Sequence, residues 1–277
     1  MSPIIIVMQK EIKDSLRNRW VMAATLLLAL LALSLGFLGS SPTGQEVKAD
    51  LLTVTVVSLS SLSIFLVPLI AMLLSHDALI GEIERGTMAL LLSYPISRTQ
   101  VLAGKFLGHV VVLLLAVTLG YGLAGLALQL SAGTLSLQGW KPLGLLILAS
   151  ILLGASFLSM GYVISAYVKE RGTAAGIAIA VWLFFVVIFD MAVLGILVAD
   201  TQQNITAGMV EYILLFNPAD IYRLLNLTGY ENTAMYAGMA GLSNQLSLSK
   251  EILFLMQWVW IIVPFILAIL IFRRRQL

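Results

Sequence analysis

The sequence contains no cysteine and few charged residues: only 11% of its 277 residues are Asp, Glu, Lys or Arg. Without cysteine, the chain has no disulfide bonds, no thiolate metal ligands and no cysteine nucleophile. Soluble domains carry about 25% charged residues, whereas this chain is 60% hydrophobic with a mean hydropathy of +1.01. A core of this size cannot bury so much apolar surface away from water, so lipid must solvate much of it. We therefore expect a single membrane domain over residues 1–277.

The motifs of several functional classes are also missing. The sequence contains no His-Glu-x-x-His and no Gly-x-Ser-x-Gly, which mark zinc proteases and serine hydrolases. It has no basic face with interleaved aromatic residues, so nucleic-acid binding is not supported. We expect a membrane protein that is not itself an enzyme.

Long runs almost free of charge predict the membrane spans, because about 20 apolar residues cross the hydrocarbon core. Strand alternation is absent and the runs are too long for barrel strands, so the spans are predicted to be helices. The six predicted spans are Trp20–Gly39, Thr53–Ser75, Phe106–Leu130, Leu143–Val168, Thr173–Ala199 and Ile252–Phe272.

The distribution of lysine and arginine predicts the orientation. With the N-terminus inside, 12 of the 16 Lys and Arg residues lie in inner segments and 4 in outer ones. Because cytoplasmic segments are enriched in these residues, both termini are predicted to be cytoplasmic, in a bacterial inner membrane. Residues 200–251 then form a long periplasmic loop, in which Asn217-Pro218-Ala219-Asp220 indicates a turn that opens a short helix at Ile221.

Residues 3–18 are predicted to form an interfacial helix. Apolar residues recur at spacings of three and four on one face, and cations occupy another, as in helices that lie in the headgroup plane. An ordinary cytosolic cap is the alternative. A cleaved signal peptide is a rival reading of the first span, but the apolar run is longer than usual and follows a segment that contains Glu11 and Asp14.

The segment 76–98, between the second and third spans, is the most informative part of the chain. Ile80, Ile83, Thr87 and Leu91 fall on one helical stripe, and Pro95 ends the element. Such an amphipathic helix, held between two spans, would move both spans when a partner pushed on it. Periodicity alone leaves open a helix that lies passively on the lipid surface.

A run within this segment resembles a known family. Its pattern is Gly81-Glu82-x-Glu84-Arg85-Gly86-Thr87, then Leu-Leu-Leu-Ser-x-Pro-x-Ser-Arg, with Gly104-Lys105 opening the next span. Together with six spans after an interfacial helix, this pattern resembles the ABC-2 type permeases, in which the segment docks on the ATP-binding subunit. The resemblance implies an ATPase-coupling role for the following residues: Asp77, Glu82, Glu84, Arg85, Gly86 and Thr87.

The resemblance also implies partners. The chain has no Gly-x-x-x-x-Gly-Lys-Ser/Thr, so it cannot cradle a nucleotide phosphate in that way. The ATPase is therefore expected to be a separate chain that binds ATP and Mg²⁺, with no cofactor in this one. Two permease chains usually face each other in the family, which implies a homodimer surrounded by membrane lipid.

Further stretches resemble the branch of the family that supports maturation of the copper–sulfide centre of nitrous oxide reductase. They are residues 14–20, 65–71, 76–78, 182–190 and 217–226. This resemblance implies a periplasmic partner and either transport of copper or a sulfur species or transmission of ATP-driven motion. The alternative is a generic exporter of lipid, glycolipid or drug, and a proton-coupled carrier is a third reading.

Asp190 is the one charged residue inside a predicted span. A charge in the bilayer costs about 2.5–3.5 kcal/mol on insertion scales, and such residues usually face the interior of the bundle. A polar lining or a contact that changes during transport is one reading. A protonated or hydrogen-bonded packing carboxylate is the other.

Methionine and histidine are the remaining candidates for a metal site. Met235 and Met239 lie one helical turn apart in the long outer loop, and thioethers are soft ligands suited to Cu(I). Pairs at this spacing more often serve packing, which is the reading we favour. His76 and His109 are expected to be polar packing residues.

Overall fold

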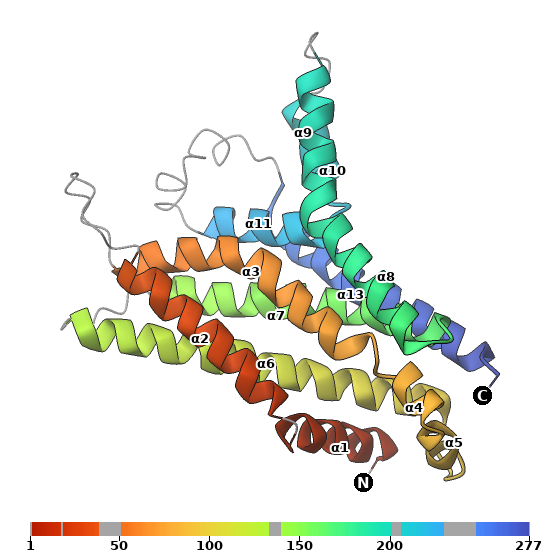
Figure 1. The fold of residues 1–277 in the computed structure, drawn as a ribbon. Coiled ribbons are helices and arrows are strands. Elements are labelled where there is room, and N and C mark those ends of the chain that lie inside the picture. The colour runs from red at the N-terminus through yellow and green to blue at the C-terminus, as the bar shows by residue number, and fades with distance from the viewer. Residues whose placement is uncertain are drawn as a thin grey trace.

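The structure of the protein is a computed structural model that describes residues 2–17, 19–38, 51–132, 140–200, 206–229 and 248–276. Within these ranges every regular element is a helix, which confirms the predicted all-helical class. Figure 1 shows a bundle of long helices, with short helices at one end and one helix standing clear of the rest.

Each predicted span corresponds to a helix or to a continuous run of helices. The helices are α2 (Trp20–Leu38), α3 (Leu51–Ser75), α6 (Arg98–Ala132), α7 (Trp140–Tyr167), α8–η1–α9 (Arg171–Ala199) and α13 (Lys250–Arg274). Five of the described helical runs are long and apolar enough to cross a membrane alone. The stretch Met22–Ser34 within α2 adds a sixth only together with α1 (Pro3–Arg17), from which it bends by 63°. The count of six and the orientation of the termini stay predictions.

The third span begins earlier than predicted. Its helix α6 starts at Arg98 instead of Phe106, so Lys105 lies within the helix and not at its entrance. Lys105 is 2% exposed, because neighbouring helices pack around it. This difference places a cation inside the protein, where the sequence suggested a residue at the membrane surface.

Helix α7 lies at the centre of the bundle, and small residues allow its neighbours to approach closely. A Cβ at Gly154 would come within 2.3 Å of Leu113, and one at Gly161 would come within 1.8 Å of the Ser75 hydroxyl. Small residues at helix contacts are typical of membrane bundles, where close packing replaces the hydrophobic effect as the source of association. By contrast, the run α8–η1–α9, which we call span five, diverges from the bundle in Figure 1.

Two short helices of the outer segment are described, α10 (Ala207–Leu214) and α11 (Pro218–Gly229). Helix α11 begins three residues before the predicted start, and the Asn217 side chain accepts the backbone N–H of Ala219 at 3.0 Å. It packs on α3, α7 and α13 through apolar residues that include Ile221 and Leu225. Helix α11 therefore packs against the bundle, whereas α10 lies beside α9 in Figure 1.

Candidate functional site: the coupling segment and two ionic clusters

The segment predicted as one amphipathic helix is two short helices. Helix α4 covers Ile80–Glu84 and α5 covers Thr87–Leu92. Between them Gly86 has a φ of 72°, in the left-handed region that glycine adopts without strain. This break shifts the helical register, so that Met88 is buried while Thr87, which was assigned to the apolar stripe, is exposed. The segment is a bent element and not a straight helix.

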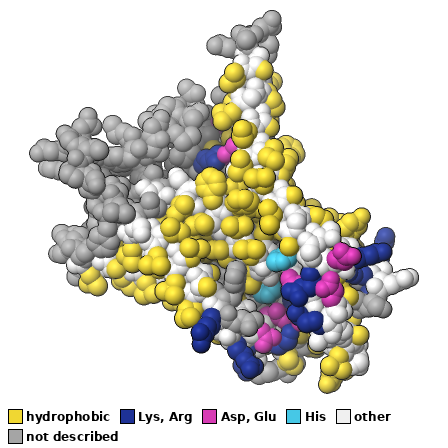
Figure 2. Space-filling view, viewed as in Figure 1, with side chains coloured by type: hydrophobic (Ala, Val, Ile, Leu, Met, Phe, Trp, Pro, Cys, Tyr) yellow, Lys and Arg dark blue, Asp and Glu magenta, His cyan; other side chains and the backbone are white. Residues whose placement is uncertain are grey.

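The bend leaves one face of the coupling segment open. Glu84, Arg85, Gly86 and Thr87, four of the six residues assigned to ATPase coupling, are exposed. Large apolar side chains lie beyond them, since Leu90 is 67% and Tyr94 66% exposed. Figure 2 shows charged side chains gathered at this end of the molecule, over α1, α4 and α5. Charged residues around exposed apolar anchors suit a protein–protein contact.

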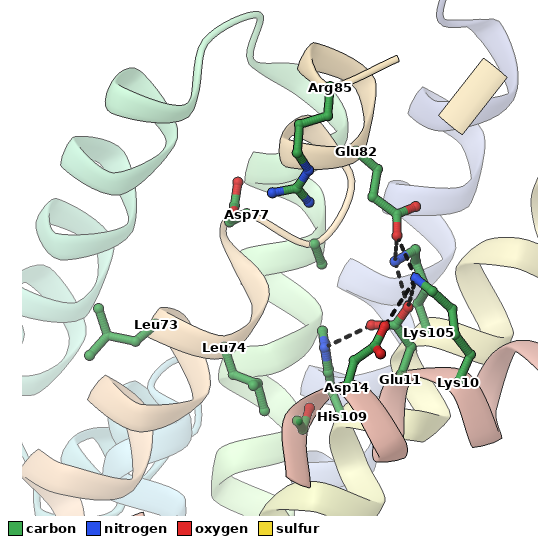
Figure 3. A pocket seen from close by; sticks show the side chains of 12 residues that line it. Lys10, Glu11, Asp14, Leu73, Leu74, Asp77, Glu82, Arg85, Lys105 and His109 are labelled. Carbon is green, nitrogen blue, oxygen red and sulfur yellow. Dashed lines mark hydrogen bonds and ion pairs between the residues drawn. The ribbon is translucent and has the colours of Figure 1, made fainter. Parts of the chain in front are cut away.

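Of the other two assigned residues, Asp77 is half-buried and Glu82 is buried. Glu82 is 7% exposed and belongs to a group of four alternating charges, here called the inner cluster: Lys10, Glu11, Glu82 and Lys105. The Lys105 ammonium lies 2.8 Å from a carboxylate oxygen of Glu11 and 2.8 Å from one of Glu82. Lys10 contacts the same two carboxylates at 3.2 and 2.8 Å (Figure 3). Glu82 therefore ties the coupling segment to α1 and α6 and is not available to a partner.

Two glycines of α6 allow α1 to come this close. A Cβ at Gly104 would lie 2.7 Å from the Cβ of Val7, and one at Gly108 would lie 2.7 Å from the Cβ of Glu11. The Gly104-x-x-x-Gly108 spacing thus forms a groove for the buried face of α1, as in small-residue helix contacts in membranes. The sequence predicts an apolar face and a charged face for the interfacial helix. In the structure a third face, which includes Val7 and Glu11, packs on α6.

A histidine extends the inner cluster toward α7. His109 Nε2 lies 3.5 Å from Glu11, and its Nδ1 lies 2.8 Å from the Tyr162 hydroxyl. Burial alone would raise the pKa of Glu11, but the hydrogen bond from His109 and the charge of Lys105 outweigh it and lower that pKa. Charged residues of this cluster, together with Leu73, Asp77 and Arg85, line a cavity of about 340 Å³.

Span five is fastened to the coupling segment by a single arginine. Arg171, the first residue of α8, donates through Nε and Nη2 to the two carboxylate oxygens of Asp77, at 2.7 and 2.6 Å. Its backbone N–H donates to Glu84 at 2.8 Å. A carboxylate at this position satisfies a free amide at the start of the helix and complements its dipole. We call Asp77, Glu84 and Arg171 the clamp.

The second ionic group, the outer cluster, consists of Asp190, Asn217, Asp220 and Arg223. Arg223 bridges Asp190 and Asp220, each at 2.7 Å. The amide of Asn217 donates to Asp220 and to the backbone carbonyl of Phe185, both at 2.8 Å. The partner of Asp190, which could not be named from the sequence, is thus Arg223 of α11. In Figure 2 a second, smaller charged patch lies near α11.

The Phe185 carbonyl, to which the Asn217 amide donates, lies in a distorted turn of span five. The segment η1 (Phe184–Ile188) is a π-helix, in which the N–H of Phe189 bonds the carbonyl of Phe184, five residues back. Burial raises the pKa of Asp220 to about 7; the positive Arg223 opposes this rise and the Asp190 carboxylate adds to it.

The remaining candidates from the sequence do not gather into a site. Met235 and Met239 lie outside the described residues, so their pairing stays a prediction. His76 contacts the backbone carbonyl of Met72 at 3.0 Å, and His109 belongs to the inner cluster. Among the described residues, no three His, Cys, Asp or Glu side chains converge as metal ligands would.

Sequence reasoning missed the inner cluster and the clamp. Their members lie far apart in the chain, as Glu11 and Lys105 or Asp77 and Arg171 do. The sequence does contain a signal for the inner cluster. Gly104-x-x-x-Gly108 flanks Lys105, and Glu11 lies on a helix that is otherwise amphipathic. No local signal pairs Arg171 with Asp77.

Comparison with known proteins identifies the family of the chain. The family model described as ABC-2 family transporter protein matches residues 5–277. The chain belongs to this family. It is 42% identical over 277 residues to a protein of Stutzerimonas stutzeri described as probable ABC transporter permease protein NosY, with 99% of each chain covered. A Pseudomonas aeruginosa protein with the same description is 42% identical over 276 residues, with 98% of each covered. Membership of this family makes the chain a permease, the non-catalytic membrane component of an ABC transporter, and implies an ATP-binding partner.

Proposed function

We propose that the chain is the membrane-spanning subunit of an ATP-driven complex that supports maturation of the copper–sulfide centre of nitrous oxide reductase. The observation that carries this proposal is the 42% identity to NosY permeases over 99% of the chain. The complex would contain two copies of this chain, a NosF-like ATP-binding subunit and a NosD-like periplasmic protein, in the inner membrane with both termini cytoplasmic. ATP and Mg²⁺ bind in the ATPase.

The exposed face of the coupling segment is the proposed contact with the ATPase. It combines acidic and basic residues with Leu90 and Tyr94, which are exposed and of a kind that can anchor the centre of a docking contact. Glu84, Arg85, Gly86 and Thr87 keep the assigned coupling role. Asp77 and Glu82 have an indirect role, because they hold the coupling segment to α8, α1 and α6.

The cargo is copper or a sulfur species, or else the chain passes ATP-driven motion to the periplasmic partner. The contacts described above favour the last of these modes, because the coupling segment is joined by ionic contacts to the end of span five, which in turn contacts the outer helix α11.

The decisive experiment compares nitrous oxide reductase purified from the native host with and without this gene. We expect loss of the copper–sulfide centre, with the other copper site of the enzyme retained, as read from copper content and the visible spectrum. Two intact centres in the deletion strain would refute the maturation role and leave a generic exporter.

Complementation with point variants tests the docking face in the same strain. Gly86→Val places a β-branched residue at a φ of 72°, which L-residues rarely adopt, without any steric clash, since no atom lies within 4 Å of its Cβ. We expect Gly86→Val to fail to restore the centre. Gly122→Val is the control, because its Cβ also meets open space but its backbone is helical. Restoration by both variants would show that the bend is dispensable.

A further inference from the structure

Span five is the least buried of the long helical runs. Only 17% of its most apolar window is buried, against 72% for α7. Its buried residues are Ala174, Ala178 and Val186, and α9 buries none. Within one chain, packing holds span five mainly along α8 and η1, and polar contacts contribute a large part of what fixes its position.

The polar contacts of span five lie at three levels along the helix. The clamp holds the inner end, the Trp182 indole N–H donates to the Phe65 carbonyl of α3 at 3.0 Å midway, and the outer cluster holds the helix at Asp190. Nineteen positions separate Arg171 from Asp190, which at a rise of about 1.5 Å per residue amounts to about 28 Å, close to the thickness of the hydrocarbon core. The clamp and the outer cluster are thus one membrane thickness apart on a single helical element.

The inner contact is built to follow the coupling segment. A bidentate arginine–carboxylate pair fixes both distance and orientation. Asp77 precedes α4 and Glu84 is its last residue, so Arg171 contacts the chain at both ends of this helix. A displacement of α4 by a partner would therefore carry the start of α8 with it.

The outer contact is built around the distorted turn η1. A π-turn breaks the regular hydrogen-bond ladder and occurs often at functional sites. Here the Phe185 carbonyl bonds Asn217, while Asp190 in the next turn bonds Arg223. Helix α11 is therefore attached where span five is least regular.

We propose that span five carries the movement of the coupling segment to α11, with Arg171 as the residue where the movement enters and Arg223 as the residue where it leaves. This inference rests on the proposed function and deepens its force-transmitting mode. Both arginines are positioning residues, because each acts through the helix that it holds.

The absence of cysteine from the chain makes the test direct. Val198→Cys places a label on α9, where the side chain is 81% exposed, and Phe216→Cys places one just before α11, where it is 71% exposed. Each protein, in complex with its ATP-binding subunit in lipid nanodiscs, carries an environment-sensitive fluorophore. We expect the emission at both positions to shift when ATP and vanadate trap the ATPase.

Variants of the two contacts then separate the steps. Arg171→Gln is expected to abolish the shift at both labels while ATP hydrolysis continues. Arg223→Gln is expected to abolish the shift at position 216 only. Lys169→Gln removes an exposed cation two residues from Arg171 and is expected to leave both shifts intact.

Two further variants guard against simple misfolding. Asp77→Asn keeps the shape of the side chain and is expected to behave as Arg171→Gln does. The exchange Asp77→Arg with Arg171→Asp is expected to restore part of the shift, which a merely destabilised protein would not show. Equal shifts in the parent and in Arg171→Gln would overturn the inference.

The experiments distinguish a failure of this inference from a failure of the proposed function. If neither label shifts while the copper–sulfide centre still depends on both the permease and ATP hydrolysis, span five is not the relay and the maturation role stands. If the centre forms without the gene, the maturation role is refuted, and shifts that depend on Arg171 would still support the relay.

Discussion

The inner and outer clusters are both ionic, but they differ in how they are buried. In the inner cluster Lys105 is 2% exposed and its two carboxylate partners about 10%, with cations and anions alternating. In the outer cluster Asp220 is equally buried, but Arg223 and Asp190 expose 34% and 26% of their side-chain surface. Buried pairs are costly to break, and exposed ones are much less so. The inner cluster thus locks α1, α4 and α6 together, whereas the outer cluster costs less to break.

Removal of the Lys105 charge is the change with the largest expected effect. Lys105→Met leaves the carboxylates of Glu11 and Glu82 buried without their main cation, which typically costs about 3–5 kcal/mol. Lys10→Met removes a cation from the same carboxylates, but the Lys10 side chain is 48% exposed, and solvated pairs contribute about 0–1 kcal/mol. Thermal unfolding of the purified protein in detergent measures both. Equal losses would mean that the inner cluster is as solvated as the outer one.

A substitution that adds a single methyl group to α6 tests its close approach to α1. Gly108→Ala places a Cβ 2.7 Å from that of Glu11, and overpacking of this kind costs about 1–3 kcal/mol. Gly122→Ala, on the same helix, meets no atom within 4 Å, so helix propensity predicts no loss and a gain of up to about 1 kcal/mol. Proteolysis of α1 should accelerate only in the first variant. Unchanged stability of Gly108→Ala would show that the groove is loose.

Removal of the arginine from the outer cluster is expected to cost less. Arg223→Gln leaves Asp220 buried, but that carboxyl can take up a proton, because its pKa is already raised to about 7. The loss of stability should therefore be about 1 kcal/mol, as for a partly solvated pair, and should be greater at pH 8 than at pH 6. Thermal unfolding in detergent at pH 6 and at pH 8 measures this loss of stability. A loss as large as that of Lys105→Met would contradict the distinction between the clusters.

The clusters also mark the limit of prediction from the sequence. Apolar runs determine the helices directly, so all six predicted spans correspond to helical runs. Asp190 was noticed because a lone charge in an apolar run is a local anomaly. The partner of Asp190 and the pairing of Arg171 with Asp77 depend on how distant helices cross, which no local pattern encodes. The bend at Gly86 was missed for a different reason: the apolar spacing continued through it, and glycine alone does not indicate a positive φ.

Acidity should affect the two clusters in opposite directions, which is the smallest and most specific effect that we expect. The pKa of Asp220 is about 7 in the folded protein and about 4 in an unfolded chain. The folded state therefore holds a proton over this range that the unfolded state has lost, and stability falls as the pH rises from about 4 to 7. The groups that face Asp220 are Asn217, Arg223 and Asp190.

Glu11 behaves in the reverse sense. Its lowered pKa stabilises the folded state above the unfolded value of about 4.3, and this contribution is lost as the pH falls below it. The Glu11 contribution is therefore constant between pH 5 and 7.5, and the difference in unfolding temperature between the parent and Asp220→Asn over this range reports on the outer cluster. Asp220→Asn should flatten the slope in this range, whereas Glu170→Gln, which alters an exposed carboxylate at the other end of span five, should not. An unchanged slope in Asp220→Asn would place the titrating group elsewhere and make the outer contact insensitive to the pH of the compartment it faces.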